Sequence, residues 1–119
     1  MFSYDKLNLF LASETFYSLL REGVPSIGDK INDDRIYMMF TSILMSIRQD
    51  ERGDTHLDDY LNVLKRIHEQ FGLTGQHAEI GKQAFAKAIE IGGKDLSDEE
   101  TSFLIDGFNR LSDQVLSAK

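Results

Sequence analysis

The chain has 119 residues, 41% of them hydrophobic and 28% charged, which suits one domain with a hydrophobic core and is too short for two. It contains no cysteine, which excludes disulfides, thiolate catalysis and cysteine-based zinc sites. The net charge of −7, with basic residues scattered along the chain, argues against nucleic-acid binding, which depends on Lys and Arg beside phosphates.

The location of the protein is also constrained by its apolar runs. The first ten residues lack the basic leader and the long apolar core of a signal peptide. No apolar run approaches the roughly 20 residues that span a bilayer. We therefore expect a cytoplasmic protein with no membrane partner.

Helical spacing of apolar residues begins close to the N-terminus. Ser3 and Ser13 are both possible N-caps, so residues 3–22 are predicted to form one helix or two helices with a kink near Ser13. Pro25 marks the end of this region. Residues 25–34 follow as a turn-rich connector.

The second helical segment has a wide apolar face, which suits a helix packed against several others. Asn32 or Asp33 is expected to cap it, and residues 50–54 are expected to form a solvated loop. The apolar positions of this segment are Ile36, Met39, Phe40, Ile43, Leu44 and Ile47.

A third helix, between Thr55 and Gly72, carries His68 in line with Leu61 and Leu64 on one apolar stripe. An unpaired buried polar group costs about 1–3 kcal/mol, so His68 must find a hydrogen-bond partner or bind a ligand. The stripe alone favours a hydrogen-bonded core histidine over a metal or cofactor ligand. A single imidazole in an apolar, all-helical cavity also suits haem iron.

Two further helices complete the chain. Thr74 can cap the first of them, whose apolar positions end at Ile91. Ser97 and Glu100 form a capping box for the second, which runs to Val115. Five or six amphipathic helices joined by short turns predict an all-α domain.

Catalytic and phosphate-binding motifs are absent from the sequence. The glycines never take Walker or dinucleotide spacing, and there is no HExxH or nucleophile elbow. The acidic pairs at helix starts are typical of charges that favour the positive end of a helix dipole. His56 and His77 are expected to face solvent, and their spacing to His68 does not form a zinc cluster.

Two blocks of the sequence resemble globins of the bacterial single-domain and flavohaemoglobin-like type. The block FYSLLREGVPSI, from Phe16 to Ile27, is similar to the globin second helix and the corner after it. The block from Leu61 to Gly81, with His68 at its centre, resembles the proximal helix, the following corner and the start of the next helix. The resemblance covers residues 12–118. It implies one globin-like domain over residues 1–119, with a shortened first helix and a shortened connector before the distal helix.

The resemblance implies that haem b is bound through Nε2 of His68, with the other ring N–H donating to a carbonyl such as that of Leu64. It also implies that Tyr17 donates to a diatomic gas, O₂, NO or CO. The register of the distal helix is ambiguous by one residue, so the gate position is Arg35 or Ile36. The next inward position is Met39 or Phe40. The implied haem contacts are His68, Leu61, Leu64, Phe71, Leu73, Ile80, Phe85, Ile31, Met39 and Phe40.

The function implied is reversible gas binding for sensing, storage or detoxification. NO dioxygenation would need an external reductase, because the chain has no flavin or nicotinamide domain. A signalling partner is a further expectation. The alternatives are a haem-free globin-like sensor or interaction domain and an unrelated helical-bundle adaptor.

Overall fold

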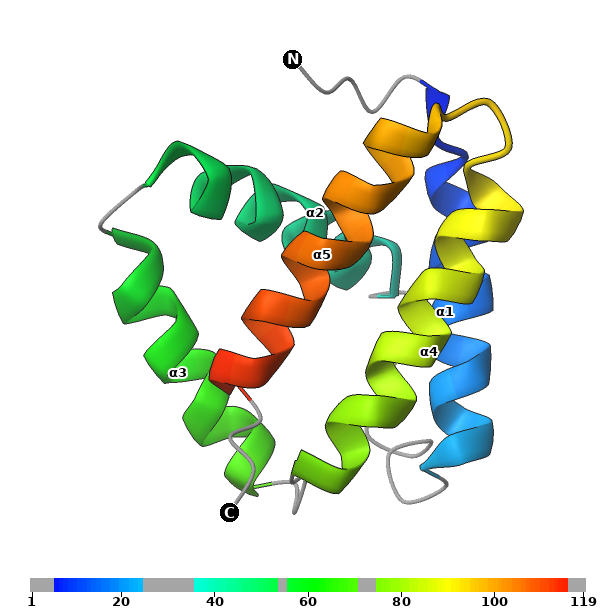
Figure 1. The fold of residues 1–119 in the computed structure, drawn as a ribbon. Helices are drawn as coiled ribbons and strands as arrows, with labels where there is room; N and C mark the ends of the chain where they lie inside the picture. The colour runs from blue at the N-terminus through cyan, green and yellow to red at the C-terminus, as the bar shows by residue number, and fades with distance from the viewer. Residues whose placement is uncertain (1–5, 25–35, 54–55, 71–74, 116–119) are drawn as a thin grey trace.

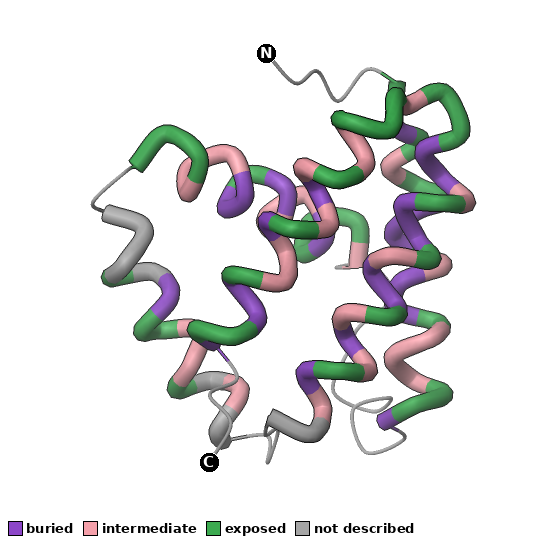
Figure 2. Tube along the Cα trace, in the orientation of Figure 1, coloured by how far each residue is buried: buried purple, intermediate pink, exposed green. Residues whose placement is uncertain are grey.

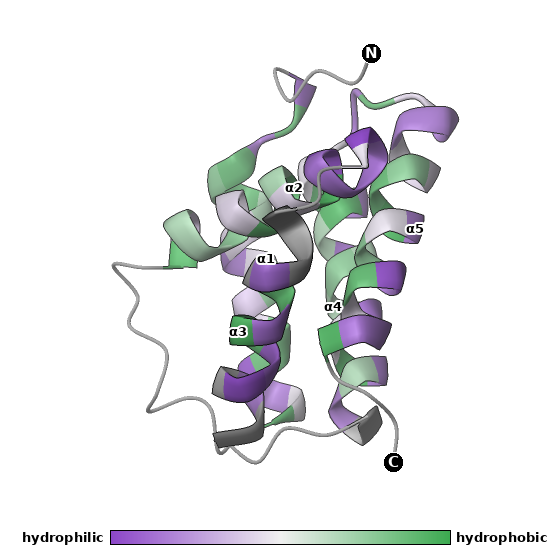
Figure 3. Ribbon diagram, turned by 90° about the vertical axis from the view of Figure 1, so that its left-hand side faces the viewer, coloured by the Kyte–Doolittle hydropathy of each residue, from purple (hydrophilic) through white to green (hydrophobic). Residues whose placement is uncertain are grey.

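The computed structural model describes residues 6–24, 36–53, 56–70 and 75–115 (Figure 1). Within these ranges the chain forms helices and no strand, which confirms the all-α fold class. Each helix carries both hydrophilic and hydrophobic segments, as amphipathic packing requires (Figure 3). The helices are α1 (Leu9–Gly23), α2 (Ile36–Arg52), α3 (His56–Gln70), α4 (Gly75–Gly92) and α5 (Asp98–Val115). Among the described helices, none combines the length and the apolarity needed to cross a membrane.

The first helix begins later than the sequence predicted and has no break. Asn8 caps α1, and its side chain accepts a hydrogen bond from the Leu11 N–H at 3.1 Å. Ser13 lies inside α1, where its buried hydroxyl donates to the Leu9 carbonyl one turn earlier. The prediction that Ser13 caps a second helix is therefore wrong, and Ser3 lies outside the described residues.

The second helix extends further than predicted. Residues 50–52 continue α2, and the Gly53 N–H donates to the Asp50 carbonyl at 3.1 Å. Gly53 has φ of 69°, a left-handed conformation that glycine adopts at little steric cost. The predicted caps Asn32, Asp33 and Thr74 lie outside the described residues, as does Thr55, which bounds the predicted third helix.

The capping box that the sequence predicted for α5 is present. The Glu100 N–H donates to the Ser97 hydroxyl at 3.1 Å, and the Ser97 N–H donates to the Glu100 carboxylate at 3.0 Å. Lys6 adds an ion pair with Glu100 at 3.4 Å. These interactions, the Ser97 N–H first among them, lower the pKa of Glu100.

Helices α1 and α4 lie side by side and antiparallel (Figure 1). At one end the Asn8 N–H donates to the Gly92 carbonyl at 2.8 Å. A Cβ on Gly92 would lie 2.9 Å from the Ala12 Cβ and 3.0 Å from the Asn8 oxygen, so only glycine permits this approach. At the other end Gly23 contacts Ile80.

Helix α5 joins the remaining elements, because it packs on α4, α2 and α3. Its ion pairs with other helices include Arg110 with Asp50 of α2 at 3.1 Å and Asp113 with Lys82 of α4 at 2.7 Å. The hydrogen bond to Asp113 raises the pKa of Lys82. Helix α3 packs on α5 and α2, and in the described ranges it does not pack on α1 or α4. The inward faces of the helices are buried (Figure 2).

The α2–α5 crossing depends on Gly107. A Cβ added there would lie 2.5 Å from Cγ2 of Ile47, which is fully buried and cannot move aside. We expect Gly107→Ala to destabilise the fold by about 1–3 kcal/mol through overpacking, although alanine is the better helix former. Urea unfolding measures the change.

Gly81 provides the matched control. A Cβ there would meet the Phe108 ring at an ordinary 3.8 Å. Gly81→Ala should therefore stabilise the protein by about 0.5–1 kcal/mol through helix propensity. Changes of the same sign in the two variants would contradict the role assigned to Gly107.

The capping box also predicts a pH dependence. The folded-state pKa of Glu100 lies below its ordinary value of 4.5, so the unfolded chain binds this proton more readily. The stability that the ionised Glu100 contributes is present above pH 4.5 and is lost as the pH falls through the folded-state pKa. Glu100→Gln keeps a side chain that can cap but removes the titration. As the pH is lowered through this acidic range, the free energy of unfolding should fall less steeply for Glu100→Gln than for wild type. Equal slopes in the two proteins would refute the prediction.

Candidate haem site

The residue on which the site depends, His68, lies half-buried in the last turn of α3. Its Nδ1 lies 2.7 Å from the Leu64 carbonyl oxygen. A carbonyl only accepts, so Nδ1 carries the proton, and in the neutral ring Nε2 holds the lone pair. The resemblance to globins implies a bond of this kind, with the Leu64 carbonyl as one possible acceptor. The bond satisfies Nδ1 only, so the role of Nε2 decides between a core residue and a ligand.

The rest of the α3 stripe is apolar, as predicted. Leu61 belongs to the buried core, and Leu64 packs against that core while half-buried. The stripe therefore turns toward α5 and α2, the helices on which α3 packs. Phe71 and Leu73, the next predicted haem contacts, lie outside the described residues.

A cluster of aromatic rings fills the space between α1, α2, α4 and α5. The Phe16 ring lies 5.6 Å from the Phe40 ring, 5.9 Å from that of Phe85 and 5.8 Å from that of Phe108. Tyr17 meets Phe16 edge-on at 4.9 Å. Phe85 stacks on Phe108 at 4.3 Å with an interplanar angle of 5°. Edge-to-face and offset stacked rings at these distances attract one another beyond their burial.

The aromatic cluster, Phe16, Tyr17, Phe40, Phe85 and Phe108, contains three of the predicted site residues. Phe40 and Phe85 are 0% and 1% exposed, because neighbouring rings and side chains cover them. Tyr17 is buried beside them. In this structure the side chains of Tyr17, Phe40 and Phe85 are packed against their neighbours and are closed to solvent. Each helix of the cluster supplies one or two rings, and sequence periodicity alone did not show that Phe16 would touch all the others.

The other predicted contacts are more peripheral. Ile36 is half-buried and Met39 is exposed at the start of α2, and Ile80 is half-buried against Gly23. Ile31 and Arg35 lie outside the described residues. The structure thus brings Tyr17, Phe40 and Phe85 together, and it places Leu61, Leu64 and His68 together on α3.

The fit of these residues to haem differs between the two groups. The α3 stripe fits, because an imidazole oriented through Nδ1 offers Nε2 to iron, and the leucines offer apolar surface. The aromatic cluster is already packed, so Phe40 and Phe85 meet other rings in the positions given for haem contacts. No three metal-ligating side chains gather within the described ranges, so a metal held there by several protein ligands has no support.

An open recess lies between α4 and α5, away from these residues. Its lining includes Gln83, Lys87, Glu90 and Thr101. None of the predicted haem contacts lines it, so we do not assign it to the candidate haem site.

The hydrogen bond from His68 can be tested directly. A neutral histidine side chain in water favours the tautomer with the proton on Nε2, whereas the Leu64 carbonyl requires it on Nδ1. We expect ¹⁵N NMR of the neutral ring to show a protonated Nδ1 and an unprotonated Nε2 for His68. A protonated Nε2 would remove the orientation on which the candidate haem site depends.

Comparisons with known proteins identify no relative of this chain. No protein-family model matches it, and no curated protein or solved structure matches it significantly. The resemblance to globins therefore rests on the residues quoted above, and the function must be argued from the geometry of His68 and the surrounding helices.

Proposed function

We propose that this chain is a globin-like domain that holds haem through His68 and reversibly binds a diatomic gas. The observation that carries the proposal is the 2.7 Å hydrogen bond between His68 Nδ1 and the Leu64 carbonyl. It orients the ring and leaves Nε2 as the nitrogen with a lone pair. Ligating histidines commonly have their second ring nitrogen held in this way.

The arrangement of the helices supports the same proposal. His68 lies on α3, and Tyr17 lies on α1, which pairs with α4. In the described ranges α3 packs on α5 and α2 but not on α1 or α4 (Figure 1). The helix proposed to carry the iron ligand and the helix that carries the tyrosine thus do not pack on each other in the described ranges, as a cofactor held between them would require.

Each residue has a defined task in this proposal. His68 would bind iron through Nε2, and Leu61 and Leu64 would cover apolar surface beside it. Haem supplies the iron centre at which the gas binds. Tyr17, which is buried on α1, would donate its hydroxyl to a bound gas that gains negative character.

Haem binding can be measured by reconstitution. Purified protein titrated with haemin should develop a Soret band at one equivalent, and His68→Gly should lose or sharply shift it. Added imidazole should restore the band in His68→Gly, because the free ring can occupy the space left by the side chain. His77→Ala removes a half-buried histidine on α4 and serves as the control that keeps the wild-type spectrum.

A wild-type protein that stays colourless after reconstitution would refute haem binding. The closed packing of Phe40 and Phe85 favours one specific alternative in that case, a haem-free globin-like interaction domain. In such a domain the aromatic cluster would be complete without a cofactor. His68 would then be a hydrogen-bonded helix residue whose replacement leaves partner binding unchanged.

A further inference from the structure

The outward face of α2 is unusually apolar for an exposed surface. Residues 36–47 contain no charged side chain over three turns of helix. Met38 is 67% exposed and Met45 is 56% exposed, with Tyr37 and Met39 exposed beside them. Charged residues normally cover a solvent-facing helix surface, and their depletion marks the centre of an interface.

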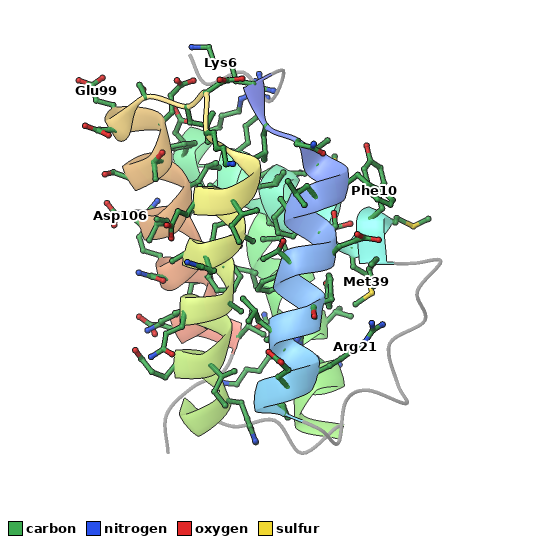
Figure 4. All side chains as sticks on the ribbon, turned by 90° about the vertical axis from the view of Figure 1, so that its right-hand side faces the viewer. Lys6, Phe10, Arg21, Met39, Glu99 and Asp106 are labelled. Atoms are coloured by element: carbon green, nitrogen blue, oxygen red, sulfur yellow. The ribbon has the colours of Figure 1, made fainter. Side chains whose placement is uncertain are left out.

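Helical geometry places this surface opposite the core. The buried residues Phe40, Leu44 and Ile47 define the inner face of α2. Met38 and Met45 are seven residues apart, so they lie on one stripe about half a turn of the helix away from the inner face. Figure 4 shows Met39 on the same side of the molecule as the exposed Phe10 of α1. We call Tyr37, Met38, Met39 and Met45 the α2 outer face, in which Met38 and Met45 form the central stripe and Tyr37 and Met39 flank it on opposite sides.

The hydroxyl groups of Thr41 and Ser42, between the two methionines, can be buried without losing hydrogen bonds. The Thr41 hydroxyl donates to the Tyr37 carbonyl at 2.9 Å, and the Ser42 hydroxyl donates to the Met38 carbonyl at 3.0 Å. Both donors are satisfied within α2, so covering them leaves no unpaired hydroxyl. Their small side chains also leave room for another backbone to approach between the two methionines.

We propose that the α2 outer face binds the same face of a second copy of the chain, with the two α2 helices antiparallel. The midpoint between Met38 and Met45 falls between Thr41 and Ser42. A two-fold axis there places Met38 of one copy beside Met45 of the other, and the reverse, as an isologous contact requires. The uncharged surface also lets two copies meet despite a net charge of −7 each.

The exposed area agrees with a dimer of ordinary size. A fully exposed large side chain presents about 200 Å², so the four residues of the α2 outer face expose on the order of 400 Å². A standard interface buries about 800 Å² per partner, and roughly 60% of it is non-polar. The α2 outer face supplies most of that apolar share, and Phe10 extends it. Methionine side chains adapt readily to such a contact.

Sedimentation equilibrium of the full chain without haem tests the proposal independently of the proposed function. Wild type should sediment as a dimer that dissociates on dilution. Met38→Glu places one negative charge from each copy in the apolar interface. It should raise the dissociation constant of the dimer at least about tenfold. Met45→Lys should act alike, while the double variant M38E/M45K should recover dimerisation through opposite charges across the antiparallel contact. Val63→Lys, at an exposed apolar site on α3, is the control and should stay dimeric.

A cysteine at the axis gives a second, independent readout. The chain has no cysteine, so any disulfide in Ser42→Cys must join two copies. Ser42→Cys should form a covalent dimer on mild oxidation, and Ser102→Cys, at an exposed site on α5, should not. A monomeric wild type at all concentrations, or equal cross-linking of the two variants, would overturn the proposal. A dimer that the double charge variant fails to recover would overturn the antiparallel contact.

Discussion

The packing of the Phe16 ring is the interaction on which the arrangement of α1, α2, α4 and α5 depends. From α1 it meets Phe40 of α2, Phe85 of α4 and Phe108 of α5. The contacts of this one side chain therefore constrain the relative positions of four helices. Removing a core phenylalanine costs about 3–5 kcal/mol, a large share of the 5–15 kcal/mol by which a domain is stable. Ion pairs between exposed side chains, such as Lys82 with Asp113, contribute far less.

Close backbone approach lets these rings meet. Gly92 brings α4 against the start of α1, and Gly107 brings α5 against Ile47 of α2. Both glycines lie where a side chain would meet atoms that cannot withdraw. The ring contacts and the glycine contacts are thus two aspects of one packing solution, because wider helix spacing would separate Phe16 from its partners.

The sequence predicts local features of this molecule better than contacts between helices. Apolar spacing and the Ser97–Glu100 box depend on neighbours within a few residues, and both agree with the structure. The bond from His68 to Leu64, which the resemblance to globins implied, also lies within one turn of helix. Ser13 is one of two possible caps by residue type, but Asn8 caps α1 and Ser13 bonds within the helix. The hub position of Phe16 could not be predicted, since it depends on rings 24, 69 and 92 residues away in sequence.

This difference also bears on the candidate haem site. The rings of the aromatic cluster pack directly against one another and so join α1, α2, α4 and α5. Helix α3 is supported differently, because its described contacts are with α5 and α2 and its histidine remains half-buried. A ligand that binds only the folded state adds stability in proportion to its affinity, and it acts first on the element that it contacts. Haem bound through His68 would therefore stabilise α3 against local opening more than it stabilises the aromatic cluster. His68 would thus have a structural role as well as a chemical one, since it lies on α3, which packs on two helices while α2 and α5 each pack on three.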